Sequence, residues 1–237
     1  MGALFAGQLN SGINAAWIIV YLASHPKWRA ACQRELESVA ARYSPDHALP
    51  LIEQLAVVPL EAWESAFPVA DACLRDSIRL QTNGVALRQN TTTGPIALND
   101  HEVVPSGFFV TYPLAEVHGD PLLYPDPDKW DPARYVNENG TPVEHPQGEN
   151  KPDEPRNYTF LGWGAARHPC LGMRFAKLEQ NIIVAFWLAY FDFELERPTG
   201  DLPVSDKNAP SAQKPKEQVR IRYWAKGTPR PTTTRVA

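Results

Sequence analysis

Cys170 is the residue of this chain whose surroundings most clearly indicate chemistry. It follows a loop that contains Trp163, Arg167 and His168, and it lies just before an apolar stretch that predicts a helix over 173–190. Unpaired backbone N–H groups and the positive end of the helix dipole favour the thiolate form of a cysteine at such a place. A thiolate held in this way can bind a soft metal ion or attack an electrophile. The alternative is that Cys170 is a small hydrophobic side chain buried before a helix.

The loop around Cys170 resembles the haem-binding loop of the cytochrome P-450 family. The family pattern has an aromatic residue seven positions before the cysteine, a glycine six before it and a glycine two after it, and these are Trp163, Gly164 and Gly172. The position two before the cysteine, whose side chain pairs with a haem propionate in the family, holds His168. The resemblance therefore implies haem b as the cofactor, with Cys170 as the proximal ligand of its iron.

The loop departs from the family pattern at two positions. Ala166 stands where the family favours glycine, and Trp163 stands where phenylalanine is more common. The resemblance further implies that the backbone amides of Leu171 and Gly172 donate hydrogen bonds to the sulfur of Cys170 and adjust its electron donation.

Composition and length set the general class of the protein. The chain has 237 residues, 43% hydrophobic residues, 23 prolines and a formal net charge of −4. These values favour one globular domain with long loops, expected to be a monomer, and argue against nucleic acid as a partner. Cys32, Cys73 and Cys170 form an odd set without paired spacing, which indicates reduced thiols. No signal peptide is recognised, and the longest apolar run, 13–23, is shorter than the roughly 20 residues of a membrane span.

Hydrophobic periodicity predicts more helix than strand. The first predicted helix, 4–24, is apolar on nearly every side, which is typical of a helix inside a large protein. Further helices are predicted at 27–43, 61–66, 69–80 and 173–190. Short strands are predicted at 85–89, 94–98, 108–112, 191–196 and 219–224. The predicted class is mainly α with small β-sheets (α+β).

The resemblance extends over the whole chain, in the order of elements that the family has. It implies that residues 1–237 are the C-terminal, haem-binding half of the cytochrome P-450 fold, and that the N-terminal half of that fold is missing. Within this half, the implied parts are a distal helix (1–25), a salt-bridge helix (68–80), a meander (116–158), and the cysteine loop with its proximal helix (160–190).

Asp76 and Arg79 lie three residues apart on a predicted helix, so their side chains can touch. An exposed pair of this kind contributes less than about 1 kcal/mol. The run 124–135 is similar to the family's meander motif, in which an arginine, here Arg134, joins such a helical pair in a buried network. The family has glutamate where this chain has Asp76. The resemblance implies that the network locks the meander behind the haem.

Arg88 lies on a predicted strand and is, on its own, consistent with a surface charge. A basic residue at this place in the family reaches a haem propionate, and the arginine fork binds carboxylates with two parallel hydrogen bonds. The resemblance thus makes Arg88 and His168 the two expected propionate partners.

The first helix carries Asn10 and Ser11 where the family's oxygenases have a threonine and a second hydroxyl residue, and Leu9 where they have an acid. These residues lie distal to the haem in the family and deliver protons to bound oxygen. Asparagine donates and accepts hydrogen bonds but does not deliver a proton. Branches of the family with this substitution include steroid hydroxylases and prostacyclin synthases, and the resemblance also extends to sterol demethylases. The alternative is a core helix with an incidental buried asparagine.

The resemblance implies a haem-thiolate monooxygenase that acts on an apolar substrate such as a steroid, terpenoid or fatty acid. Its partner would be an NADPH-dependent reductase, and its location the cytosolic face of the endoplasmic reticulum membrane, through an N-terminal anchor absent from this chain. A first alternative is a peroxide isomerase or dehydratase on the same haem. A second alternative is a truncated fragment without enzymatic activity.

Overall fold

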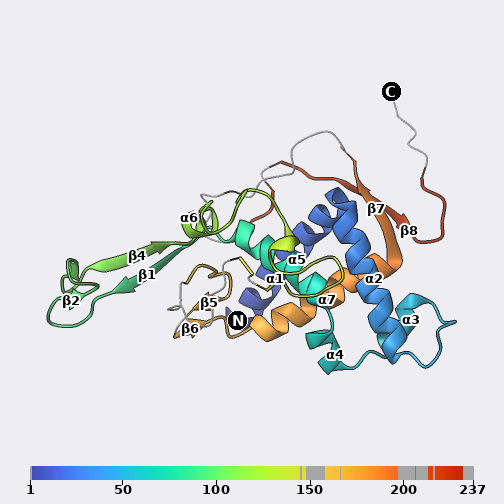
Figure 1. Cartoon of the computed structure of the whole chain (residues 1–237), viewed down its shortest axis with the longest axis horizontal. Helices are drawn as coiled ribbons and strands as arrows, with labels where there is room; N and C mark the ends of the chain where they lie inside the picture. The colour runs from blue at the N-terminus through green and yellow to red at the C-terminus, as the bar shows by residue number, and fades with distance from the viewer. Residues whose placement is uncertain are drawn as a thin grey trace.

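The computed structural model of the chain describes residues 2–144, 146–147, 158–165, 167–196, 206, 213–215 and 217–231. Four long helices make up its body: α1 (Gly2–Ser24), α2 (Pro26–Tyr43), α5 (Pro68–Gln81) and α7 (Met173–Tyr190). Helix α1 packs against α2, α5 and α7, as Figure 1 shows. The short helices α3 (Leu51–Ala56) and α4 (Leu60–Ser65) pack against α7 at one end of this body.

One continuous hydrophobic core holds the four helices together. Its largest contributions come from side chains on all four of them: Trp17, Ile18, Leu22, Leu36, Ala40, Leu74, Ile78, Val184 and Leu188. Burying each of the valine, leucine and isoleucine side chains among them stabilises the fold by about 1.5–3 kcal/mol. The core therefore fixes α5 and α7, the two helices next to the predicted network and the predicted cysteine site.

Two helices begin at a proline, one residue earlier than predicted. Pro26 and Pro68 occupy the first turns of α2 and α5, where the missing N–H costs nothing and the fixed φ suits a helix. The next two N–H groups of α5 are satisfied from another helix. Glu35 of α2 accepts hydrogen bonds from the N–H of Val69 (2.7 Å) and of Ala70 (3.0 Å).

The strands form four small antiparallel sheets of two strands each among the described residues. Strands β1 (Val85–Gln89) and β4 (Phe109–Pro113) pair with Val85 opposite Pro113, and β2 (Ile96–Ala97) pairs with β3 (Val103–Val104) farther out on the same arm (Figure 1). The remaining pairs are β5 (Gly164–Ala165) with β6 (His168–Pro169), and β7 (Phe191–Leu195) with β8 (Ile221–Ala225). The helical body with small sheets confirms the predicted α+β class.

Some short elements differ from the prediction. Strand β3 was not predicted, and the strand predicted at 94–98 is reduced to the two residues of β2. Helix α6 (Leu114–His118) overlaps the start of the predicted meander, which also contains the 3-10 turn η1 (Pro132–Arg134). These elements are too short to show a hydrophobic period. Residues 145 and 148–157 of the meander lie outside the described part of the chain.

No helix in the described ranges combines the length and the apolar character that crossing a bilayer requires.

Candidate functional site

A tight hairpin presents Cys170 at the entrance of α7. Strands β5 and β6 pair Gly164 with Pro169, and the backbone N–H of Cys170 donates a hydrogen bond to the carbonyl oxygen of Trp163 (2.6 Å). Gly164 has a φ of +71°, and a Cβ at this position would lie 2.4 Å from the carbonyl oxygen of His168. Only glycine fits this turn without strain. The hairpin therefore fixes the backbone of Cys170 relative to Trp163.

The thiol of Cys170 lies on an exposed surface with several apolar side chains. Leu171 is fully exposed, Phe175 is 61% exposed and Met173 is 41% exposed. Gly172 is the residue before the first turn of α7, and a Cβ there would meet nothing within 4 Å. We call Cys170, Leu171, Gly172, Met173 and Phe175 the Cys170 face. Large apolar side chains grouped around a thiol in this way are typical of a surface that another group covers.

The three other predicted haem contacts lie on different elements. Trp163 is half-buried and packs against the hydrophobic core, and His168 is exposed on β6. Arg88 is exposed on β1, and its Nη1 donates a hydrogen bond to the carbonyl oxygen of Leu87 (2.7 Å). Within the described ranges neither Arg88 nor His168 forms an ion pair with a carboxylate, and no hydrogen bond joins either of them to Cys170.

The chemistry of these residues fits a haem. A cysteine thiolate is a known axial ligand of haem iron. The apolar side chains of the Cys170 face match the flat hydrocarbon ring, and the exposed nitrogen donors Arg88 and His168 match its two carboxylates. Cys170, Arg88 and His168 were predicted from the sequence, whereas the exposed apolar side chains of Leu171, Met173 and Phe175 were not.

The two predicted distal residues lie in different environments on α1. Ser11 is buried, and its carbonyl oxygen accepts a hydrogen bond from Nε2 of Gln180 on α7 (2.6 Å). Asn10 is exposed, and its carbonyl oxygen accepts from Nδ2 of Asn14 (3.0 Å). The alternative of a buried asparagine in a core helix is therefore wrong for Asn10. The described contacts do not join either residue to Cys170.

The structure brings Asp76, Arg79 and Arg134 together. Oδ1 of Asp76 lies 2.7 Å from Nε of Arg79 and 3.5 Å from Nε of Arg134. All three side chains are almost completely buried, so this is not an exposed pair. Burial acts to lower the pKa of Arg79, but the Asp76 carboxylate outweighs this effect, and the net pKa of Arg79 is raised. Arg79 is therefore charged inside the protein.

The network also fixes the backbone of the segment that follows α6. Nη1 of Arg79 donates to the carbonyl oxygens of His118 (2.9 Å) and Pro127 (2.6 Å). Nη1 of Arg134 donates to the carbonyl oxygen of Pro125 (2.7 Å). The backbone N–H of Asp131 donates to Oδ2 of Asp76 (2.6 Å). The carbonyl groups that this irregular segment leaves unpaired are thus satisfied by buried cations.

Sequence reasoning missed two residues of this region. The Tyr135 hydroxyl donates to Oδ1 of Asp76 (3.3 Å), and Nε2 of His118 accepts from the backbone N–H of Leu161 (3.0 Å). The second bond joins the network to the loop that carries Cys170. A single histidine at the end of a five-residue helix gives no signal in the sequence that would have revealed it.

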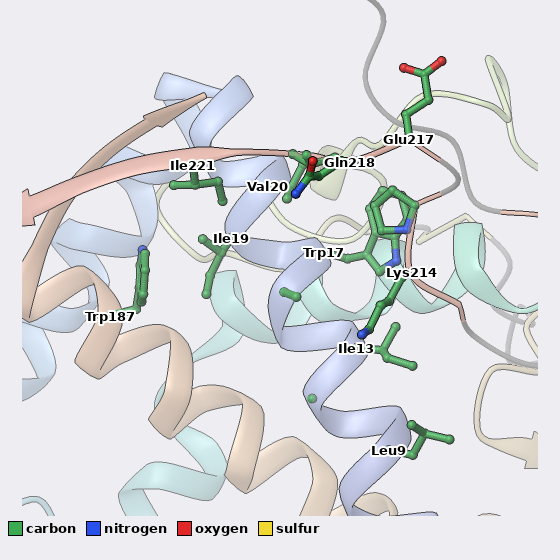
Figure 2. A pocket seen from close by; sticks show the side chains of 14 residues that line it. Leu9, Ile13, Trp17, Ile19, Val20, Trp187, Lys214, Glu217, Gln218 and Ile221 are labelled. Atoms are coloured by element: carbon green, nitrogen blue, oxygen red, sulfur yellow. The ribbon is translucent and has the colours of Figure 1, made fainter. Parts of the chain in front are cut away.

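A separate apolar groove of about 880 Å³ runs along α1. Figure 2 shows Leu9, Ile13 and Trp17 of α1 on one side of it, with Trp187 of α7 and Ile221 of β8 farther along. None of the residues predicted for haem binding or catalysis lines this groove. The groove also corrects one prediction: α1 is not buried on all sides, because Leu9 is 43% exposed where the helix borders the groove.

Comparison with known proteins agrees with these features. The sequence profile described as Cytochrome P-450 matches residues 1–221. The chain is 39% identical over 194 residues to cytochrome P-450 monooxygenase AacuE of Aspergillus aculeatus, covering 81% of this chain and 36% of that protein. It is also 39% identical over 203 residues to cytochrome P-450 monooxygenase nsrP of Aspergillus novofumigatus, covering 84% of this chain and 37% of that protein.

Two more distant relatives have names that state a reaction. The chain is 29% identical to 7-alpha-hydroxycholest-4-en-3-one 12-alpha-hydroxylase of Oryctolagus cuniculus, over 94% of this chain and 44% of that protein. It is 28% identical to prostacyclin synthase of Bos taurus, over 93% of this chain and 43% of that protein. The chain spans little more than a third of the length of the two fungal relatives. It belongs to the cytochrome P-450 family, whose members bind haem b.

Proposed function

We propose that this chain is the haem-bearing part of a haem-thiolate monooxygenase that oxidises an apolar substrate, such as a steroid, a terpenoid or a fatty acid. The observation that carries the proposal is the exposed thiol of Cys170 on an apolar face, in a loop with the family's spacing, at the start of α7. When bound, a haem with a thiolate ligand supplies the chemistry that cleaves the O–O bond.

The chain's own residues bind and orient that group in this proposal. The Cys170 thiolate holds the iron, and the half-buried Trp163 shields the sulfur from water. Arg88 and His168 hold the two carboxylates. Asn10, on the exposed side of α1, would offer a hydrogen bond but no proton to the oxygen substrate, and Ser11 would be the neighbouring hydroxyl able to hold a proton.

Replacing the proposed ligand tests the assignment directly. Purified protein loaded with haem, reduced and exposed to carbon monoxide should show the Soret band of a thiolate-ligated haem. Cys170→Ala should abolish this band, whereas Cys32→Ala, which removes a buried thiol, should keep it. An unchanged band in Cys170→Ala would refute the assignment of the ligand. Failure of the unaltered protein to take up haem would instead favour a fragment without enzymatic activity.

A peroxide isomerase is the second candidate function. It is favoured by Leu9 and Asn10, which replace the acid and the alcohol that deliver protons to oxygen, and by the similarity to prostacyclin synthase. Turnover of a fatty-acid hydroperoxide without NADPH or reductase would support this candidate. Strict dependence on an NADPH-dependent reductase would support the monooxygenase.

We extend the proposal to the location of the whole protein. The resemblance implies attachment to the endoplasmic reticulum membrane, with the haem on the cytosolic side. Membrane fractionation of the cells that produce the protein tests this, and recovery of all of it in the soluble fraction would contradict it.

A further inference from the structure

His118 lies between the Asp76 network and the loop that leads to Cys170. It ends α6 and is only 2% exposed. Its carbonyl oxygen accepts a hydrogen bond from Nη1 of Arg79 (2.9 Å), and its ring atom Nε2 accepts one from the backbone N–H of Leu161 (3.0 Å). Its backbone therefore binds the network and its side chain binds the loop.

The backbone of Leu161 is held by hydrogen bonds on both sides of its Cα. Its N–H donates to His118, and its carbonyl oxygen accepts from the N–H of Gly164 (2.9 Å), which starts strand β5. Strand β5 pairs with β6, and the N–H of Cys170, just after β6, donates a hydrogen bond to the carbonyl oxygen of Trp163, just before β5. A continuous series of hydrogen bonds thus leads from His118 to the backbone of Cys170.

Close packing places the loop against α5 and against the ring of His118. A Cβ on Gly162 would lie 2.3 Å from Cγ2 of Ile78, the neighbour of Arg79 in α5. The Phe160 ring stacks on the His118 ring with centroids 5.5 Å apart. A larger residue at Gly162 would push the loop away, so the loop depends on both the tight packing and the bond from Leu161.

The bond to Leu161 requires a neutral ring. Because the backbone N–H is the donor, Nε2 must offer its lone pair, and the single ring proton must be on Nδ1. Burial first, and then the charge of Arg79, lowers the pKa of His118 to about 4, so the ring is neutral at pH 7. A second proton on Nε2 would remove the acceptor and place a charge next to Arg79.

The charged groups around the ring are mainly cations. Arg79 faces it from α5, and the guanidinium of Arg75 lies 4.8 Å from the ring centroid of Phe160, on which His118 stacks. Tyr124 meets the ring with its edge, at 6.4 Å between centroids. Glu116 is the acidic residue of α6, and it is exposed. Strand β1 comes near α6 at Val85, which pairs with Pro113 just before α6, so Arg88 lies farther away along the strand. Burial and the charge of Arg79 therefore oppose protonation of His118 until the solution is acidic.

We propose that His118 is a positioning residue that ties the Cys170 loop to the Asp76 network, and that a second proton on its ring releases the start of this loop. The importance of this link for catalysis rests on the function proposed above, because only then does the position of Cys170 matter. The link itself is a property of the polypeptide and can be tested without haem.

A matched pair of variants isolates the acceptor. His118→Gln removes the ring but offers an oxygen near the position of Nε2, whereas His118→Leu removes both the ring and the acceptor. Both keep the backbone carbonyl that binds Arg79. Hydrogen exchange at the Leu161 amide, followed by NMR at pH 7, should be about tenfold faster in His118→Leu than in the unaltered protein, because a buried donor loses its partner. Exchange in His118→Gln should stay within about threefold of the unaltered protein.

The pH dependence distinguishes a switch from a purely structural contact. The Leu161 exchange rate in the unaltered protein is divided by the rate in His118→Gln at the same pH. This ratio cancels the intrinsic effect of pH on amide exchange. This ratio should be near one at pH 7 and should rise about tenfold as the pH approaches 4, while amides of α2 keep a constant ratio. A ratio that stays near one down to pH 4, or equal exchange in the two variants at pH 7, would overturn the proposal.

The haem-loaded protein provides a second measurement. On acidification, the thiolate-type Soret band should be lost at a higher pH in the unaltered protein than in His118→Gln, because only the unaltered protein has a ring to protonate. Loss of the band at the same pH in both proteins would show that the link does not control the position of Cys170. Absence of the band at any pH would refute the proposed function and leave the exchange experiment as the test of His118.

Discussion

The Asp76 network and the two proposed partners of the haem carboxylates, Arg88 and His168, place nitrogen donors in opposite environments. Arg79 and Arg134 are buried, and their donors meet the Asp76 carboxylate and backbone carbonyls of the same chain. Most donors of the network are satisfied within this polypeptide, although Nε of Arg134 has no hydrogen-bond partner among the described residues. Arg88 and His168 are exposed, and neither pairs with a carboxylate in the described part of the chain.

This contrast indicates which property each region controls. A buried ion pair is costly to disrupt, because the remaining partner stays buried without compensation. Truncating an exposed cationic side chain changes the free energy of unfolding little, since water already solvates its charge. We therefore expect substitutions in the network to change the free energy of unfolding, and substitutions around Cys170 to change haem binding at nearly constant stability.

Arg79→Ala should break the network and give the largest effect. It removes the hydrogen bonds from Arg79 to Asp76 and to the carbonyl oxygens of His118 and Pro127, and leaves the Asp76 carboxylate buried. We expect a loss of about 3–5 kcal/mol in the free energy of unfolding, measured by urea denaturation. Arg174→Ala is the matched control, because Arg174 forms a two-pronged pair with Glu64 that is exposed.

The control should leave the urea midpoint nearly unchanged. A loss below about 1 kcal/mol in Arg79→Ala would be the value of an exposed pair and would contradict the role of burial in the network.

Features that depend on neighbouring residues in the sequence were predicted, whereas features that depend on tertiary packing were not. The spacing of Trp163, Gly164 and Cys170 was readable because the hairpin is local, and its chemistry depends on a few consecutive residues. The long helices were predicted to within a few residues, because their apolar period and their starting prolines are also local signals. The exposure of Asn10 was not predictable, because it depends on what packs beside α1.

Two contacts that stabilise the site left no sequence signal. Glu35 caps α5 from 34 residues away, and His118 binds Leu161 from 43 residues away. Neither contact has a local pattern, since both arise only when helices and loops pack in three dimensions. Such long-range polar contacts are the part of the site that the sequence does not reveal.

Glu35→Gln sharpens the comparison by removing a half-buried ionisable group that, among the described residues, has no ion-pair partner of the kind that Asp76 has. Burial raises the pKa of Glu35 to about 7, against the opposing effect of the two α5 N–H donors. The folded protein therefore keeps this proton between about pH 4.5 and 7, where the unfolded chain releases it, so stability falls as the pH rises through this range. The stability of the unaltered protein minus that of Glu35→Gln should fall by about 3 kcal/mol from pH 4 to pH 8.

Chemical denaturation of both proteins at each pH gives this difference. His118, whose pKa is lowered, makes stability fall with decreasing pH, but it is present in both proteins and cancels in the difference. A difference that is constant with pH would show that Glu35 titrates in the same way in the folded and unfolded chains.

Arg88→Ala should have the smallest effect on folding and a selective effect on haem. Arg88 is exposed, and in the described part of the chain its side chain bonds only to the carbonyl oxygen of Leu87 in its own strand, so the urea midpoint should not move. If its guanidinium holds a haem carboxylate, haem affinity measured by spectroscopic titration should fall about tenfold, the effect of losing one charge-assisted hydrogen bond. Haem dimethyl ester, which has no carboxylates, is the control ligand and should bind equally to Arg88→Ala and to the unaltered protein. An equal loss of affinity for haem and for its ester would mean that Arg88 contacts the ring or supports β1, and the contrast between satisfied and unsatisfied cations would then no longer describe this molecule.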